Sequence, residues 1–288
     1  IGVKGVSTYA VSIGDACFSV FRSDQTSKVK TMCLPVIIKL VRMKIATLTA
    51  ENFRVHSKVE TLLTELAYNK NTQTVKGNIL QTLGVLAEHF PEHLVGQAKT
   101  LLVMLSDLLS EQFKDKKPDY QVIDGGMRGL ISLLVHFSGE VTSDPKKVAT
   151  IWRFTLACLN PPEGLKTYAI PKAGLMMVEK HAELFKQYLT EKSSTVYPLI
   201  KTYCTHATNR GMRKFGFSAL EAFLYQVAHE IVSEDRTKDA NMATLRFFFE
   251  EFWAGLQERN TGLLTSSVYV RGLGIFAKSI DYYMGPTE

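Results

Sequence analysis

Six segments of this chain carry one apolar signature at a nearly constant spacing, and this periodicity limits the possible folds more than any single residue does. Each segment opens with an apolar residue that is followed by small or apolar residues at about +4 and +8, as Gly126 and Leu130 follow Val122. The segments open at Val29, Val75, Val122, Ala169, Met212 and Val268, at intervals of 46, 47, 47, 43 and 56 residues. A period of about 40–47 residues is typical of repeats built from paired helices. The spacing therefore predicts an array of stacked helical pairs.

The predicted fold class is all-α. We expect a right-handed α-α superhelix, a HEAT/armadillo-like solenoid of about six helical pairs, that forms one segment over residues 1–288. The first helices of the pairs are expected near residues 9–21, 53–68, 92–113, 145–159, 195–207 and 241–257, and the second helices begin near the six opening residues. Asp144-Pro145 provides an N-cap and a first-turn proline for one of them. No period-two alternation appears, so strands are not predicted.

The composition is compatible with such an array. With 288 residues and 45% hydrophobic side chains, the chain can bury a large core, and in a stacked array each repeat needs only its neighbours. No apolar run approaches the roughly 18–20 residues of a membrane span, so no membrane partner is expected. The chain begins at Ile1 without the regions of a signal peptide, and we expect it to be a piece of a longer protein with exposed apolar ends.

The four cysteines, Cys17, Cys33, Cys158 and Cys204, are scattered through apolar helical contexts without a close pair. This pattern matches neither a zinc site nor a disulfide framework, and buried free thiols are predicted instead. Free thiols are typical of a reducing compartment, the cytosol or the nucleus.

The common catalytic motifs are absent from the sequence, so no catalytic, cofactor-binding or metal-binding residue is predicted. Gly272-Leu-Gly274-Ile-Phe-Ala277 matches a dinucleotide-binding loop, but that loop must follow a strand, and close helix packing accounts better for both glycines. Pro91 separates His89 from His93, so a capping or exposed pair is favoured over a metal site. Glu250 and Glu251 are expected to edge a wide aromatic core face made by Phe247, Phe248, Phe249, Phe252 and Trp253.

The positive charge is the one surface property that suggests a partner. The net charge is +6 and the isoelectric point is near 9.0. Basic residues gather at turns between helices: Lys114, Lys116, Lys117, Lys146, Lys147, Arg210, Arg213 and Lys214. Because the turns of a solenoid stack into ridges, these residues could line one edge and bind a nucleic acid or another partner. The alternative is an ordinary solvated surface.

Several runs of the sequence carry a resemblance. They are Leu63-Thr-Glu-Leu-Ala67, Leu83-Gly-Val-Leu-Ala-Glu-His-Phe-Pro91, Lys166-Thr-Tyr-Ala-Ile-Pro-Lys-Ala-Gly-Leu175, Ser218-Ala-Leu-Glu-Ala-Phe-Leu224 and Val270-Arg-Gly-Leu-Gly-Ile-Phe-Ala277. In their order and spacing these runs resemble the N-terminal helical-repeat region of the DNA-dependent protein kinase catalytic subunit family, which belongs to the lipid-kinase-related protein kinases.

This resemblance implies a parent with a kinase domain elsewhere, where ATP and Mg bind, while the present segment holds no catalytic residue and no cofactor. It implies a nuclear serine/threonine kinase that the Ku heterodimer recruits to DNA double-strand ends in non-homologous end joining. The partners implied for this segment are double-stranded DNA ends, Ku and other repeats of the same chain.

Two other function classes stay open. A generic HEAT-repeat adaptor or transport scaffold that binds protein partners would show the same periodicity, and is preferred if the basic residues do not share one edge. An enzyme built on a helical array would require a deep pocket that brings histidines and carboxylates together with displaced pKa values.

Overall fold

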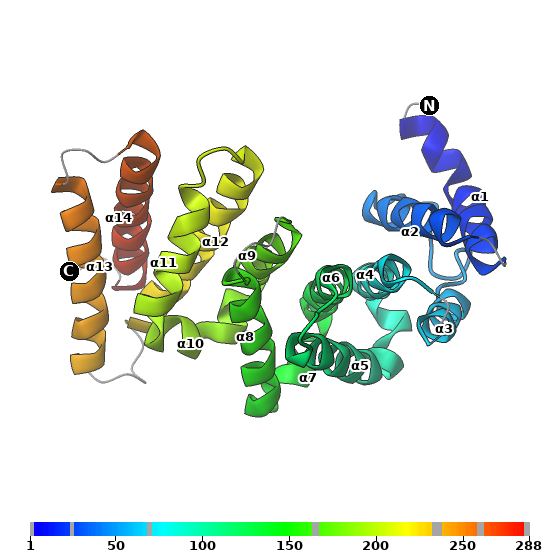
Figure 1. The fold of residues 1–288 in the computed structure, drawn as a ribbon, viewed down its shortest axis with the longest axis horizontal. Helices are drawn as coiled ribbons and strands as arrows, with labels where there is room; N and C mark the ends of the chain where they lie inside the picture. The colour runs from blue at the N-terminus through cyan, green and yellow to red at the C-terminus, as the bar shows by residue number, and fades with distance from the viewer. Residues whose placement is uncertain are drawn as a thin grey trace. The chain divides into compact units, whose positions relative to one another are not determined.

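The computed structural model describes residues 3–23, 26–67, 71–162, 167–231, 238–257 and 262–284, and helices joined by turns make up this part of the chain (Figure 1). No strand occurs within these ranges, which agrees with the predicted all-α class. The chain comprises two compact units, residues 1–147 and 148–288.

The described part of the first unit contains six long helices. They are α1 (Val3–Arg22), α2 (Ser27–Arg42), α3 (Val55–Leu66), α4 (Gln73–His89), α5 (Val95–Lys114) and α6 (Tyr120–Phe137), with a short η1 (Pro91–His93) and α7 (Gly139–Thr142). Helices α1 and α2, α3 and α4, and α5 and α6 pack as pairs, and α2, α4 and α6 pack in succession.

The second unit begins within α8 (Pro145–Leu159). It continues with α9 (Ala169–His181), η2 (Ala182–Phe185), α10 (Lys186–Glu191), α11 (Ser193–Cys204), α12 (Arg210–Ile231), α13 (Lys238–Gln257) and α14 (Leu263–Met284). Helices α11 and α12, and α13 and α14, pack as pairs, and α12 packs against both α9 and α14.

The twelve expected helices match long helices of the structure, with differences at their ends. Helix α1 begins at Val3 rather than near residue 9, and α11 ends at Cys204 rather than near residue 207. The sequence pattern did not predict the helical turns α7, η2 and α10, because segments of four to six residues are too short to show a helical period.

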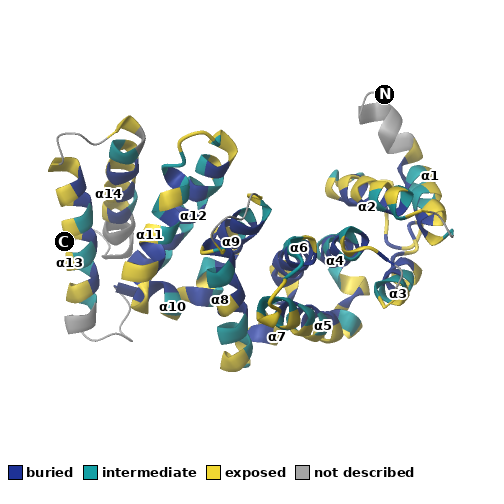
Figure 2. Ribbon diagram, viewed as in Figure 1, coloured by how far each residue is buried: buried dark blue, intermediate teal, exposed yellow. Residues whose placement is uncertain are grey.

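The repeated apolar signature marks the buried face of the second helices (Figure 2). All residues at +4 and +8 are buried: Cys33, Ile37, Ile79, Leu83, Gly126, Leu130, Ala173, Met177, Gly216, Leu220, Gly272 and Phe276. Among the opening residues Val29 and Ala169 are half-buried and the other four are buried. The period is therefore a packing signal.

In three of the six repeats the +4 residue is a glycine, and it lies where the two helices of a pair touch. A Cβ added to Gly126 would lie 3.0 Å from Leu109 Cδ2 of α5, and one added to Gly216 would lie 2.7 Å from the backbone nitrogen of Cys204 in α11. A Cβ on Gly272 would likewise lie 2.8 Å from the Phe252 ring of α13. Packing thus explains Gly272. The residues that precede it belong to α14, whereas a dinucleotide-binding loop would follow a strand. The packing explanation is wrong for Gly274, whose added Cβ would meet nothing within 4 Å.

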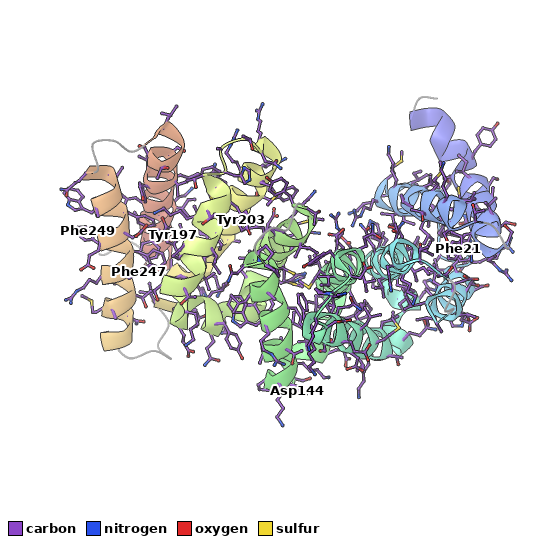
Figure 3. The ribbon with its side chains drawn as sticks, viewed as in Figure 1. Phe21, Asp144, Tyr197, Tyr203, Phe247 and Phe249 are labelled. Carbon is purple, nitrogen blue, oxygen red and sulfur yellow. The ribbon has the colours of Figure 1, made fainter. Side chains whose placement is uncertain are left out.

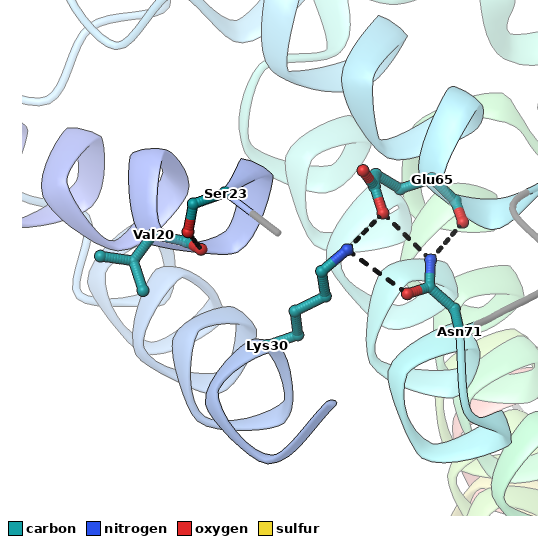
Figure 4. A network of polar contacts seen from close by, with 5 residues as sticks. All are labelled: Val20, Ser23, Lys30, Glu65 and Asn71. Atoms are coloured by element: carbon teal, nitrogen blue, oxygen red, sulfur yellow. Dashed lines mark hydrogen bonds and ion pairs between the residues drawn. The ribbon is translucent and has the colours of Figure 1, made fainter. Parts of the chain in front are cut away.

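A charged network ties α2 to α3 and to Asn71, which lies between α3 and α4 (Figure 4). Lys30 Nζ donates to Glu65 Oε2 at 2.8 Å and lies 3.5 Å from Asn71 Oδ1. The Asn71 amide donates to the Glu65 carbonyl at 2.6 Å and to Glu65 Oε2 at 3.0 Å. Burial raises the pKa of Glu65, but the hydrogen bonds from Lys30 and Asn71, together with the charge of Lys30, outweigh burial and lower it.

No helix within the described ranges has both the length and the apolar character needed to cross a membrane.

Replacing Gly216 with Ala should destabilise the second unit by about 1–3 kcal/mol, because the new methyl group would collide with the backbone of α11. Gly274→Ala in α14 is the matched control, since it adds the same group inside a helix in open space and should stabilise by up to about 1 kcal/mol. Urea unfolding followed by circular dichroism measures both. Equal effects of the two substitutions would contradict the packing role of the +4 position.

Replacing Glu65 with Gln should lower the free energy of unfolding at pH 7 by about 1.5–3 kcal/mol, the range for a hydrogen bond to a charged group. The folded state depresses the pKa of Glu65, so its contribution is present above the unfolded value and is lost as pH falls through the folded pKa. The difference between wild type and Glu65→Gln should therefore shrink in acid below about pH 4. Glu111→Gln, the same change at an exposed position of α5, is the matched control and should alter the free energy of unfolding at pH 7 by less than about 0.5 kcal/mol.

Candidate nucleic-acid interface

Three exposed lysines lie where α5 ends and the turn to α6 begins: Lys114 is the last residue of α5, and Lys116 and Lys117 lie in the turn. The backbone of the turn is held by acidic and amide side chains: Asp115 Oδ1 accepts from the Lys117 N–H at 3.0 Å, and Gln112 Oε1 accepts from the Asp119 N–H at 2.8 Å. None of the three lysines forms an ion pair with a residue that the structure describes. We call these three residues the turn cluster. Its backbone is fixed by these hydrogen bonds, and its amines are open to a ligand.

Lys146 and Lys147 lie in the first turn of α8. Asp144 Oδ1 accepts from the Lys146 N–H at 3.0 Å, which confirms the predicted cap at this end of α8 (Figure 3). Lys147 is half-buried, and its Nζ donates to the Glu140 carbonyl at 3.2 Å. Two cations at the positive end of a helix dipole raise the local potential, whereas Asp144 lowers it.

Arg210, Arg213 and Lys214 lie in the first turns of α12, at the positive end of its dipole. Arg210 and Lys214 are exposed, but Arg213 is half-buried and serves the fold. Its Nη1 donates to the His206 carbonyl at 2.8 Å and to the Ala207 carbonyl at 3.1 Å, just after α11 ends. The guanidinium therefore holds the turn between α11 and α12, and only part of it can face a ligand.

Within the first unit the basic residues do not share an edge. The turn cluster precedes the N-terminal end of α6, while the contact of Lys147 with Glu140 keeps the second pair beyond its C-terminal end. An 18-residue helix separates the two groups, about 27 Å at the usual rise per residue. The expectation that the basic residues line one edge of the solenoid is therefore wrong for these two groups. Their role in binding a nucleic acid stays a prediction.

His89 and His93 contact their own neighbours in the chain rather than each other. His89 Nδ1 lies 3.0 Å from the Val85 carbonyl, and His93 Nε2 lies 3.7 Å from a Glu92 carboxylate oxygen. A cleft of about 550 Å³ contains Glu88, His89 and His136, but His136 Nε2 lies 2.9 Å from the Glu88 carbonyl at the end of α4. No set of three or more His, Cys, Asp or Glu residues within the described ranges is arranged to hold a metal ion.

The aromatic residues of α13 divide between two faces. Phe248 and Phe252 are buried and pack against Tyr197, with ring centroids 5.8 Å apart in each case. The expectation of one wide aromatic core face is wrong for Phe249 and Trp253, which are 61% and 53% exposed and stack on each other. These two residues come one position after the buried ones and therefore point about 100° away.

Glu251 takes part in a structural ion pair. Lys201 Nζ donates to Glu251 Oε1 at 2.6 Å and to the Tyr269 hydroxyl at 2.7 Å. Burial lowers the pKa of Lys201, but its bonds to Glu251 and Tyr269 outweigh burial and raise it. The network joins α11, α13 and α14, and the pairing holds Glu251 as a partner for Lys201 rather than as a free acid or base.

The prediction of free, buried thiols holds for Cys33, Cys158 and Cys204, while Cys17 is half-buried. Burial raises the pKa of Cys204 to about 12, which keeps its sulfur in the unreactive thiol form.

Sequence analysis missed a cleft of about 600 Å³ in the first unit, between α1 and α3. Its cationic lining comes from Arg22, Arg54 and Lys58. These residues stand on different helices and belong to no recognisable motif, so only their meeting in space reveals the site. The one local signal is the spacing of Asp15, Ser19 and Arg22 by four and three residues, which puts them on one face of α1.

Comparison with known sequences gives one consistent result. A family described as "DNA-PKcs, N-terminal" matches residues 2–284. The chain is 33% identical over 286 residues to the DNA-dependent protein kinase catalytic subunit of Dictyostelium discoideum, 30% to that of Xenopus laevis and 30% to that of Mus musculus. The alignments cover 97%, 95% and 94% of this chain, which spans about 7% of the length of each relative.

A solved structure shares the fold. The crystal structure of an engineered protein matches with a TM-score of 0.51 over 93% of this chain and 97% of that chain, at 13% sequence identity. At this identity the similarity concerns the fold alone.

Replacing Arg213 with Ala should destabilise the second unit by about 1–3 kcal/mol, because the carbonyls of His206 and Ala207 would lose a charged donor. Lys214→Ala, the exposed neighbour, should change stability by less than about 0.5 kcal/mol. Thermal unfolding at matched protein concentration compares the two variants. A Lys214→Ala effect as large as that of Arg213→Ala would contradict the assigned role.

Proposed function

This chain belongs to the DNA-PKcs N-terminal family, and from that premise we propose that it is a non-catalytic scaffold arm of a DNA-dependent serine/threonine protein kinase. The observation that carries the proposal is the family match over residues 2–284, on a chain whose described part is helical. We propose that ATP and Mg act in a kinase domain elsewhere in the parent protein. The role of this segment is then to hold partners at a distance from that domain.

The finer architecture that we propose is a right-handed α-α superhelix of about six helical pairs. The regular packing of second helices on one another within each unit supports it, because such stacking is how a solenoid propagates.

The partners that we propose are DNA double-strand ends and the Ku heterodimer, in the nucleus, during non-homologous end joining. The relatives are named as catalytic subunits of a DNA-dependent protein kinase, and this name supports a DNA partner. The net charge of +6 and the exposed amines of the turn cluster suit an anionic polymer. Arg210 and Lys214 offer a second exposed pair at the start of α12.

A generic adaptor that binds protein partners is the second candidate, and two observations favour it. The turn cluster and the Lys146–Lys147 pair lie at opposite ends of α6, which gives no continuous basic edge there. Helix α13 also exposes Met242, Phe249 and Trp253, at spacings of seven and four residues on one face. An exposed apolar stripe is typical of a protein-binding surface.

Binding to a short blunt-ended DNA duplex across about 50–200 mM salt tests the DNA role, with fluorescence anisotropy as the measurement. Replacing the turn cluster with alanines should weaken binding and reduce the salt slope by about 0.9 for each phosphate contact that is lost. Arg210→Ala/Lys214→Ala should act in the same direction. Lys28→Ala/Lys39→Ala/Lys99→Ala, which removes three exposed charges elsewhere, is the charge-matched control.

The outcomes separate the two candidate functions. Equal weakening by the control would reduce the effect to net charge, and absence of binding at low salt would remove the DNA role of this segment. Loss of Ku capture on Ku-loaded duplex in Phe249→Ser/Trp253→Ser, with duplex binding unchanged, would assign the Ku contact to α13. Absence of both duplex binding and Ku capture would favour the generic protein-binding adaptor.

A further inference from the structure

The cleft between α1 and α3 gathers positive charge from two helices. Helix α1 lines it with one face near its C-terminal end, where Asp15, Ser19 and Arg22 are spaced by four and three residues. Arg54, which precedes α3, and Lys58, in its first turn, line the opposite side. Three cations and one carboxylate leave an excess of two positive charges around about 600 Å³ of space.

Lys58 is the fixed charge of this cleft. Its side chain is only 5% exposed, and its Nζ lies 2.5 Å from both Asp15 Oδ1 and the Phe53 carbonyl. The ammonium group also lies over the Phe53 ring, 4.1 Å from the centroid. Burial lowers the pKa of Lys58, and the hydrogen bond and charge of Asp15 oppose that effect. Lys58 and Asp15 thus form a preorganised pair at the wall.

The two arginines are the adaptable charges. Arg54 is 73% exposed on its side chain, and its Nη2 lies 3.6 Å from Asp15 Oδ2, which is beyond hydrogen-bonding distance. Arg22 is exposed and forms no ion pair with any residue in the described ranges. Both guanidinium groups can therefore turn toward a ligand without breaking a hydrogen bond to a described side chain.

The polar lining suits a tetrahedral oxyanion. The hydroxyls of Ser19, Ser23 and Ser57 join the cations around the space. Ser23 Oγ already donates to the Val20 carbonyl at 2.6 Å, so Ser19 and Ser57 are the better donors (Figure 4). Helix α3 also starts here without a side-chain cap, but the Val55 N–H already donates to the Ala50 carbonyl at 3.0 Å, so the cations and hydroxyls define the site.

The charge balance distinguishes between phosphate types. A phosphate monoester carries about −1.5 to −2 at neutral pH and so matches the excess of two positive charges. A backbone diester carries a single charge, and a duplex presents its phosphates along an extended surface rather than within one cleft. Arginine forks bind a terminal phosphate through paired hydrogen bonds. The ligand that fits best is therefore a single terminal phosphate.

We infer that the cleft between α1 and α3 binds a phosphate monoester dianion through Arg22, Arg54 and Lys58, with serine hydroxyls as further donors. This site shares no residue with the turn cluster or with the basic residues of α8 and α12.

The test measures binding of methyl phosphate to the whole chain by ³¹P NMR line broadening, with dimethyl phosphate as the diester arm. Methyl phosphate should bind at least about tenfold more tightly than dimethyl phosphate, since charged hydrogen bonds are the strong ones. Arg22→Gln/Arg54→Gly should weaken methyl phosphate binding by about tenfold or more. Glycine is chosen because Arg54 has φ of 51°, which glycine adopts without steric cost, so the start of α3 is kept.

The control variant matches both changes outside the cleft. Arg42→Gln/Lys44→Gly removes the same number of positive charges. Lys44 has φ of 49°, so glycine fits there as it does at Arg54. Binding that the control weakens as much as the test variant would overturn the proposal, as would equal binding of the two phosphates. A duplex without terminal phosphates that binds as tightly as methyl phosphate, and loses binding in Arg22→Gln/Arg54→Gly, would make the cleft a backbone site and overturn the monoester assignment.

Discussion

The contact between the two helices of a pair is the constraint on which each unit depends. Where α12 meets α11, the backbone of Gly216 lies so close to Cys204 that a side chain of any size would collide. Gly126 and Gly272 occupy the same repeat position in α6 and α14. Because interiors are close-packed, glycine at this position lets the paired helices lie closer together in these three repeats. The residue at +8 then completes the buried face of the second helix.

Charge serves two purposes in this chain, and burial separates them. Lys30, Lys58 and Lys201 bond to carboxylates and connect helices within a unit. Breaking a buried pair leaves an uncompensated charge, so these lysines belong to the fold. In the turn cluster the hydrogen bonds hold the backbone of the turn, and the exposed lysine amines stay open to a partner. The cleft between α1 and α3 combines both kinds, since Lys58 is buried and Arg22 is exposed.

Features that depend on residues close together in the sequence were predicted correctly, whereas features that depend on residues far apart in the sequence were not. The second helices and their buried +4 and +8 positions were predictable, because helical period and residue size are local properties. Phe249 and Phe252 could not be told apart, since both are aromatic and only the position of the neighbouring helix makes one exposed and the other buried. Arg213 looked like a surface cation because nothing in its neighbours shows that it bonds to carbonyls beyond α11.

The sequence by itself determined the all-helical class, the position of nearly every long helix and the family, because repeat spacing and residue identity are written along the chain. Tertiary structure alone decided which charged side chains form ion pairs within the fold. It also decided that two basic groups of the first unit lie at opposite ends of α6 and that Arg22 and Lys58 line the same cleft. The physical reason is that packing brings together residues distant in sequence, and the energy of a charge depends on what surrounds it there.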